Sequence, residues 1–470
     1  MTLPRLGRNV SLLAISALLF PGTASAHGIA AKADLPIPAW LFAWAATIVL
    51  LVSFGALAAL WTSPKLEVSG TRDLIPLGRW IDVVLGVAGV GWFALVCWAG
   101  LTGTFVPTAN LAPTAVWVWF WVGMPILSAL FGDVFRLLNP WRAVGRAAGF
   151  FMAWFLPSGL PTPNAWPARL GRFPAAAGLL AVGWLELASA SRDDPSTLAT
   201  LALVYAAIQL LGMSAFGVEA WSSRGDSFGV LFSLIAKIAP FEREGGRLRL
   251  RAPLAGLVRM PQVGWTQGLL LVVIGVTSFD GFTQGPIWAN LAQWLSARAQ
   301  DLGFGLTGAA EAAATVGILG AIAVVSLIWT LGVAASAREL GKPAKEVGRA
   351  FGHVLVPIAL AYTVAHYISL LLIQGQAVGY LVSDPTGSGA NWFGSAQWTV
   401  NYGLISPTGV WWAQVAALVL GHIAALTLAH DRALELSPDS KTATRSQVPM
   451  LIATVAFTTL GLWLLSAASL

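Results

Sequence analysis

Two ionisable side chains stand in segments that are otherwise apolar: Asp280 in VTSFDGF and His366 in HVLVPIALAYTVAHY. A carboxylate and an imidazole are ligands that Zn²⁺ or another first-row divalent ion takes from proteins. Ionisable groups at membrane depth are costly and usually mark a functional site. The two residues therefore predict a site for a metal ion or a protonated partner, provided that the fold brings them together.

The elements that must position these residues are membrane helices. The chain has 470 residues, of which 57% are hydrophobic and 10% are charged, and a soluble fold of this length could not cover so much apolar surface. The net charge of +6 comes from Lys and Arg scattered over short loops, which indicates membrane topology and no nucleic-acid partner. The predicted fold class is an all-α polytopic transmembrane helix bundle.

About ten segments are apolar over the roughly 20 residues that a span requires. They lie near residues 39–61, 80–101, 114–135, 174–190, 198–219, 265–280, 306–333, 350–374, 409–430 and 448–468. Two shorter apolar stretches with charged edges, 141–156 and 226–240, predict interfacial or re-entrant helices. The charged run FEREGGRLRLR at 241–251 predicts a solvated loop.

Residues 1–26 have the pattern of a secretory signal peptide: two arginines, the apolar run Val10–Phe20, and the small residues Ala24-Ser25-Ala26. Cleavage there would make His27 the first mature residue and would leave 27–470 as a single integral membrane domain. An uncleaved short helix is the alternative.

The basic residues predict the orientation in the membrane. Loops on the side of the mature amino terminus hold only Lys32, Arg192 and Arg298, and all other Lys and Arg of the mature chain fall in loops of the opposite side. The positive-inside rule therefore predicts a multi-pass protein of the bacterial inner membrane with both mature termini on the extracytoplasmic side.

With this orientation, the polar groups sort into two levels. His353 and His366 are separated by about 20 Å of helical rise, so they cannot bind one ion together. The outer set contains His27, Asp280 and His366, with Glu186, Glu311 and Tyr362 near them. The inner set contains His353, His422 and His430, and Glu219 lies at the same level. For His353 and His422, interhelical hydrogen bonding is the alternative to a role as metal ligands.

Other patterns limit the chemistry. Cys97 is the single cysteine, which excludes an intrachain disulfide and a cysteine-based metal site. The glycines of 86–91 lie within a predicted span, so they indicate helix packing and not a dinucleotide-binding loop. Asp133 and Arg136 are spaced for a structural ion pair on one helix. The aromatic residues of the loop 375–407 predict either a lid over the outer site or an interfacial belt.

Several stretches together resemble a known family. They are the mature start HGIAAKADLPIPAWLFAWAATIVLLVSF, then LNPWRAVGR, GLLAVGWLEL, GVEAWSSRGDSFGVLFSLIAKIAPF, VTSFDGF, HVLVPIALAYTVAHYISLL and WWAQVAALVLGHIAALTLAHDRAL. In these stretches the chain is similar to the bacterial membrane proteins named fenitrothion hydrolases, and the similarity covers nearly all of the mature chain. The resemblance implies hydrolysis of neutral organophosphorus triesters at their aryl ester bond.

Hydrolysis of this kind requires an activated water and help for the departing aryloxide, and a divalent metal ion can supply both. On this expectation Asp280, His366 and His27 hold the ion, Glu311 or Glu186 takes the water proton, and Tyr362 steadies the leaving group. The substrate is a small hydrophobic molecule that arrives from the lipid bilayer.

A transporter or channel for an ion or a proton is the alternative function, with the outer and inner sets as successive stations of one path. A second membrane subunit, or further copies of the chain, is an additional possible partner.

Overall fold

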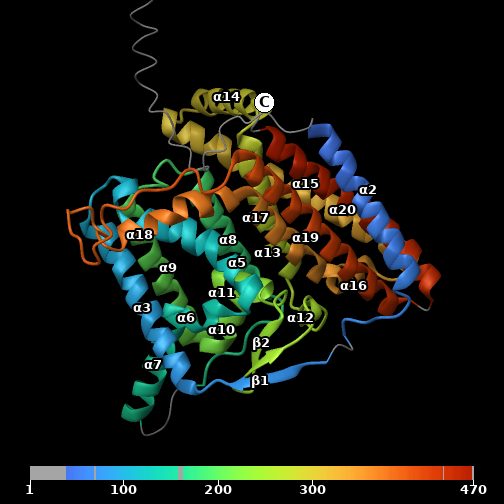
Figure 1. Ribbon diagram of the computed structural model, residues 1–470, viewed down its shortest axis with the longest axis horizontal. Helices are drawn as coiled ribbons and strands as arrows, with labels where there is room; N and C mark the ends of the chain where they lie inside the picture. Colours follow the sequence, from blue (N-terminus) through green and yellow to red (C-terminus); the bar gives the residue numbers. More distant parts are fainter. Residues whose placement is uncertain (1–38, 68–69, 157–161, 438, 468–470) are drawn as a thin grey trace, which may run out of the picture.

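Helices dominate the computed structural model, which describes residues 39–67, 70–156, 162–437 and 439–467 (Figure 1). The helices pack side by side, and a small β-sheet lies at one end of the bundle, at the bottom of Figure 1. We call this the sheet end and the opposite end, across which α14 lies, the α14 end. The predicted all-α polytopic bundle is confirmed.

All ten predicted spans are helical. They correspond to α2 (Ala39–Leu60), α3 (Arg79–Thr102), the continuous α4 (Leu111–Pro113), η2 (Thr114–Gly123) and α5 (Met124–Phe131), α8 (Phe173–Leu187), α9 (Pro195–Phe216), α13 (Thr266–Thr283), α15 (Leu306–Leu340), the run α16 (Ala344–Phe351), η3 (Gly352–Val354), α17 (Leu355–Ile373), η4 (Gln374–Ala377) and α18 (Val378–Leu381), α19 (Pro407–Leu436) and α20 (Ser440–Ala467). In the described part of the chain, 8 helical segments are long and apolar enough to cross a membrane, and α2 and α8 supply shorter apolar helices. These properties are those of a multi-pass membrane protein.

Shorter elements connect the long helices. They are η1 (Pro107–Ala109), α6 (Val134–Leu138), α7 (Pro140–Phe155), α10 (Val218–Arg224), α11 (Ser227–Ile235), α12 (Ala255–Val258) and α14 (Pro286–Asp301). The two predicted short helices are α7 and α11, and their environments differ. Phe232 and Leu234 of α11 are fully buried in the protein, whereas Trp154 and Phe155 near the end of α7 are largely exposed.

The charged run 241–251 is a β-hairpin, so the prediction of a solvated loop was wrong. Strands β2 (Phe241–Glu244) and β3 (Arg247–Leu250) pair with each other, and β3 also pairs with β1 (Arg72–Pro76), which gives the antiparallel order β1-β3-β2. Gly245 and Gly246 form the turn, and both have the positive φ that a tight hairpin requires. Arg249 of β3 donates a hydrogen bond to Asp73 of β1 at 2.8 Å, so the carboxylate of the neighbouring strand compensates the charge of this arginine.

Asp226 joins three helices at the centre of the first half of the bundle. Its side chain is fully buried and caps α11 by accepting from the Gly229 backbone N–H. It also accepts hydrogen bonds from Asn139 (2.8 Å), Trp141 (2.6 Å) and the Tyr205 hydroxyl (2.8 Å). This carboxylate therefore fixes the start of α11 relative to α7 and α9.

The glycines of α3 allow close helix packing, as the sequence predicts. A Cβ atom at Gly89 would lie 1.8 Å from the carbonyl oxygen of Leu138, whereas a Cβ atom at Gly91 would meet nothing within 4 Å. The backbone of the α6–α7 connection thus occupies the space that a side chain at Gly89 would need.

Substitution of Gly89 with alanine is expected to lower the free energy of unfolding by about 1–3 kcal/mol, because backbone must move to accommodate the methyl group. Gly91→Ala, the matched control two positions away, is expected to leave stability unchanged or to raise it by up to about 1 kcal/mol through helix propensity. The unfolding midpoint of each variant in detergent measures the difference. Equal midpoints for the two variants would contradict the packing at Gly89.

Candidate functional site

Asp280 and His366 come together between two neighbouring helices. Asp280 lies in the last turn of α13 and His366 in the second half of α17, and both helices run from the sheet end to the α14 end (Figure 1). The distance from His366 Nε2 to Asp280 Oδ2 is 2.9 Å. Asp280 is 2% exposed, so the pair is enclosed by the bundle and does not point to lipid.

Tyr367 is a third member of the site. Its hydroxyl donates to the same oxygen, Asp280 Oδ2, at 2.7 Å, and its ring packs edge-on against His366. The consecutive residues His366 and Tyr367 thus reach the carboxylate from two sides. Tyr367 was not among the predicted site residues, which included Tyr362 one turn before His366, although Tyr367 follows His366 directly in the same apolar segment.

Glu186 brings a second carboxyl group to this place. It lies in the last turn of α8 and interacts electrostatically with Asp280 and Tyr367. Its Oε2 atom is buried and has no hydrogen-bond partner among the described residues, and the same is true of the neighbouring Trp121 indole N–H. We call Asp280, His366, Tyr367 and Glu186 the Asp280 cluster.

The charges of the Asp280 cluster require a positive counterpart. Two carboxylates in apolar surroundings repel each other strongly, so they are stable together only when they share a proton or face a cation. An imidazole that is bonded directly to one of them can supply that positive charge in its protonated form. The arrangement is therefore suited to taking up and releasing a proton at a place that is shielded from water.

Trp121 belongs to a stretch of π-helix. The segment η2 is wound as a π-helix from Thr114 to Gly123, and the N–H of Met124 bonds to the carbonyl of Trp119. Such windings are rare in proteins and frequently occur at functional sites. This stretch presents the buried Trp121 side chain toward Glu186.

The five predicted metal ligands do not all meet. The structure brings Asp280 and His366 together, and His27 lies outside the described residues. His422 is fully buried, with Nδ1 2.7 Å from the Leu418 carbonyl oxygen, and His353 is enclosed at the other end of the α17 run. Within the described ranges, no three His, Cys, Asp or Glu side chains are grouped closely enough to hold an ion. The described residues therefore do not complete a metal site, and the divalent ion stays a prediction.

Two predicted catalytic residues are engaged away from Asp280. Glu311 accepts a hydrogen bond from the Ala190 backbone N–H at 3.1 Å and so holds the connection between α8 and α9. The Tyr362 hydroxyl donates to the carbonyl of Phe457 on α20, and its ring contacts His422. Of the three predicted catalytic residues, Glu186 is the one that the structure brings to the Asp280 cluster.

The aromatic loop 375–407 packs on α3, at the left of Figure 1, whereas α13 ends beneath α14. Trp392 stacks on Trp98 with ring centroids 5.8 Å apart, and the two rings line a pocket of about 550 Å³ together with Thr386. Phe393 and Trp398 are more than half exposed. This placement favours the interfacial belt over a lid on the Asp280 cluster.

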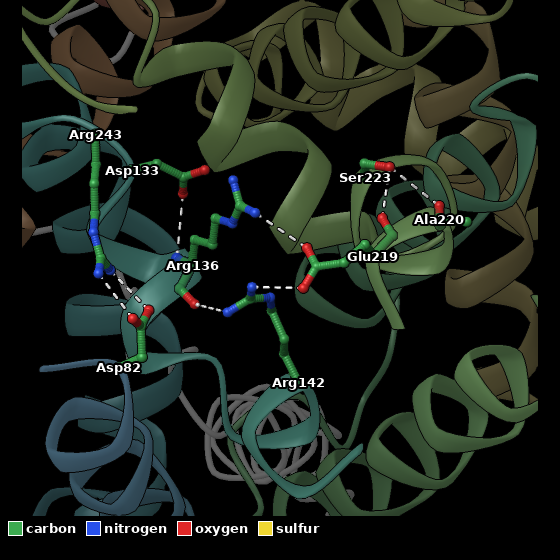
Figure 2. A network of polar contacts seen from close by, with 8 residues as sticks. All are labelled: Asp82, Asp133, Arg136, Arg142, Glu219, Ala220, Ser223 and Arg243. Atoms are coloured by element: carbon green, nitrogen blue, oxygen red, sulfur yellow. Dashed lines mark hydrogen bonds and ion pairs between the residues drawn. The ribbon is translucent and has the colours of Figure 1, made fainter. Parts of the chain in front are cut away.

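Charged residues at the sheet end form a separate network (Figure 2). Arg136 pairs with Glu219 at 3.1 Å rather than with Asp133, which instead caps α6 by accepting from the Arg136 backbone N–H. Glu219 also pairs with Arg142 at 2.7 Å. These contacts connect α6, α7 and α10, so Glu219 has a structural role in the described fold.

No model of a protein family, no curated protein and no solved structure matches the chain.

Proposed function

We propose that the chain is an integral membrane hydrolase that cleaves the aryl ester bond of neutral organophosphorus triesters at the Asp280 cluster. The observation that carries the proposal is the 2.9 Å contact between His366 Nε2 and Asp280 Oδ2 inside an apolar bundle. A carboxylate bonded to one imidazole nitrogen fixes the tautomer and the orientation of the ring, as general-base catalysis requires. The resemblance in sequence supplies the substrate class.

The reaction uses the tautomer in which His366 Nε2 carries the proton and donates a hydrogen bond to Asp280 Oδ2. In this tautomer Nδ1 is the proton acceptor. A water oxygen attacks phosphorus while Nδ1 takes the water proton, and the P–O bond to the aryl group breaks with its electron pair on the departing aryloxide. The imidazolium then returns this proton to the aryloxide, so the products are the dialkyl phosphate or thiophosphate and the phenol.

The remaining members of the Asp280 cluster support this step. Asp280 stabilises the imidazolium that forms, and the Tyr367 hydroxyl holds the carboxylate in place. Glu186, as a second carboxyl group beside Asp280, is the alternative acceptor of the water proton. The apolar surroundings suit a neutral substrate that enters from the bilayer.

For the orientation, we propose that the α14 end faces the extracytoplasmic side of a bacterial inner membrane. The sheet end carries the arginines of β1 and β3, among them Arg72, Arg247 and Arg249, and the positive-inside rule places such residues in the cytoplasm. The Asp280 cluster then lies near the extracytoplasmic surface.

The test is release of nitrophenol from a nitrophenyl phosphotriester by the full-length protein, assayed both in its own membranes and after purification in detergent. Assay in membranes retains any second subunit that activity requires. Metal content and the effect of a chelator are measured on the same preparations; loss of activity on chelation, with recovery on adding Zn²⁺, is expected if the predicted ion is present. Folded protein that releases no nitrophenol in either form, with or without added metal, would contradict the proposal.

Transport of protons or cations is a second candidate. His353 Nε2 and His422 Nε2 are buried without a hydrogen-bond partner among the described residues, and both lie where α19 packs against the α17 run. However, a proton path along the α17 run would have to cross the interval between Tyr362 and His353. The helical rise over this interval is about 13 Å, which no direct hydrogen bond spans. Val356 and Ile358, which lie in this interval, are buried apolar residues. A proton flux into protein-containing liposomes, lost in His353→Asn, would favour transport.

A further inference from the structure

Arg172 is a buried cation that has no acidic partner among the described residues. It directly precedes α8, it is 5% exposed, and its Nη1 donates to the Thr266 hydroxyl at 2.8 Å. Its Nε atom is buried and has no hydrogen-bond partner among the described residues. No ion pair joins Arg172 to a carboxylate in the described ranges, although a buried guanidinium is normally paired.

The charged groups around Arg172 are also cationic. Burial, together with the charge of Arg224 at the end of α10, lowers the pKa of Arg172 to about 10. Burial likewise lowers the pKa of Lys237, which follows α11, and the charges of Arg251 and Arg172 add to this effect. Asp133 and Glu242 act on Lys237 in the opposite direction, but Glu242 is paired with Arg251.

Two helix amino termini meet at Arg172. The residue stands at the N-cap position of α8, and its backbone N–H bonds to the Gly264 carbonyl at 2.8 Å. Its side chain reaches Thr266, the first residue of α13. Neither helix has a side-chain cap at this end. The positive ends of two helix dipoles therefore add to the charge of the guanidinium, and such a place binds anions.

Aromatic residues locate this place relative to the membrane. Phe173 and Trp265 pack against each other with ring centroids 4.9 Å apart, and they are 45% and 50% exposed. Exposed aromatic rings next to cationic side chains are typical of the level of the lipid headgroups. An anion that approached Arg172 from this side would come from the level of the lipid headgroups.

We propose that Arg172, together with Lys237 and Arg224, binds the phosphate group of an anionic phospholipid at the sheet end, between the amino termini of α8 and α13. This site is separate from the Asp280 cluster, which lies at the other end of α13 and α8. Basic pockets between transmembrane helices bind anionic lipid headgroups by the same chemistry.

The experiment measures the unfolding midpoint of the full-length protein in detergent as phosphatidylglycerol, phosphatidylcholine with the same acyl chains, or inorganic phosphate is added. Phosphatidylglycerol is expected to raise the midpoint, and native mass spectrometry is expected to show a bound phosphatidylglycerol molecule. Arg172→Gln, which retains a hydrogen-bond donor for Thr266, is expected to abolish both effects. Lys237→Gln and Arg224→Gln are each expected to weaken binding about fivefold.

Arg298→Gln is the matched control, because Arg298 lies on α14 and is exposed and paired with Asp301. This variant is expected to keep both the midpoint shift and the bound phosphatidylglycerol of the parent chain. Equal shifts with both lipids, or retention of the shift in Arg172→Gln, would overturn the proposal. An equal shift with inorganic phosphate would show that the ligand is a free anion and would overturn the assignment to lipid. If Arg172→Gln does not fold, unchanged lipid binding in both Lys237→Gln and Arg224→Gln overturns the proposal equally.

Discussion

His366→Ala is expected to lower kcat for triester hydrolysis by about 10²- to 10⁴-fold, which is the usual contribution of a positioned general base. The substitution removes the proton acceptor. Of the two α17 side chains that bond to Asp280, His366 and Tyr367, it leaves the Tyr367 hydroxyl. Initial rates of nitrophenol release at saturating substrate measure the effect. The unfolding midpoint of the same preparation shows whether the variant is folded.

His422→Ala is the matched control for His366→Ala. His422 is also buried and lies on the neighbouring helix α19, but its Nδ1 contacts the Leu418 carbonyl and not the Asp280 cluster. Its substitution is expected to leave kcat within about threefold of the parent chain, since no group of the reaction is removed. A folded His366→Ala variant with parental kcat, or an equal loss in both variants, would contradict the role of His366 as the base.

Asp226→Ala is expected to lower the free energy of unfolding by at least about 4 kcal/mol. Each buried donor that loses its acceptor costs about 1–3 kcal/mol, and the substitution strands the side chains of Asn139, Trp141 and Tyr205. The loss of the N-cap of α11 adds about 1 kcal/mol. Unfolding in increasing sodium dodecyl sulfate, followed by tryptophan fluorescence, measures the change.

Asp194→Ala measures the contribution of a helix N-cap without that of a buried hydrogen-bond network. Asp194 also caps a helix, α9, but it is partly exposed and its other bond is to the adjacent Ser196 hydroxyl. Its substitution is expected to cost about 1 kcal/mol, the value of a cap alone. If the two variants lose stability equally, the buried network at Asp226 does not stabilise the fold as argued.

The spans could be predicted from the sequence because each is a long apolar run, and length with composition suffices to identify such a helix. The sheet could not. Strand β3 alternates arginine and leucine, a charged pattern that a solvated loop shares, and β1 lies far from it in the chain. The pairing of Arg249 with Asp73, which distinguishes the two outcomes, depends on a contact between distant segments.

The Asp280 cluster was predictable in part. Asp280 and His366 are isolated ionisable residues at the same predicted depth, so their meeting followed from topology. The choice of Tyr367 over Tyr362 depends on the rotation of α17 about its axis relative to α13, which composition and spacing do not define. The same limit applies to Arg136, whose partner Glu219 lies on another helix.

The β1–β3 pairing has a consequence for biogenesis. Asp73 and Arg249, which bond across the sheet, are separated by 176 positions of the chain. At a synthesis rate of about 5–20 residues per second, the ribosome needs roughly 9–35 s to deliver the second strand after the first. During this interval the edge of β1 stays unpaired while the helices encoded between the two strands, α3 to α11, are synthesised, so the sheet closes only after the first half of the bundle has been made.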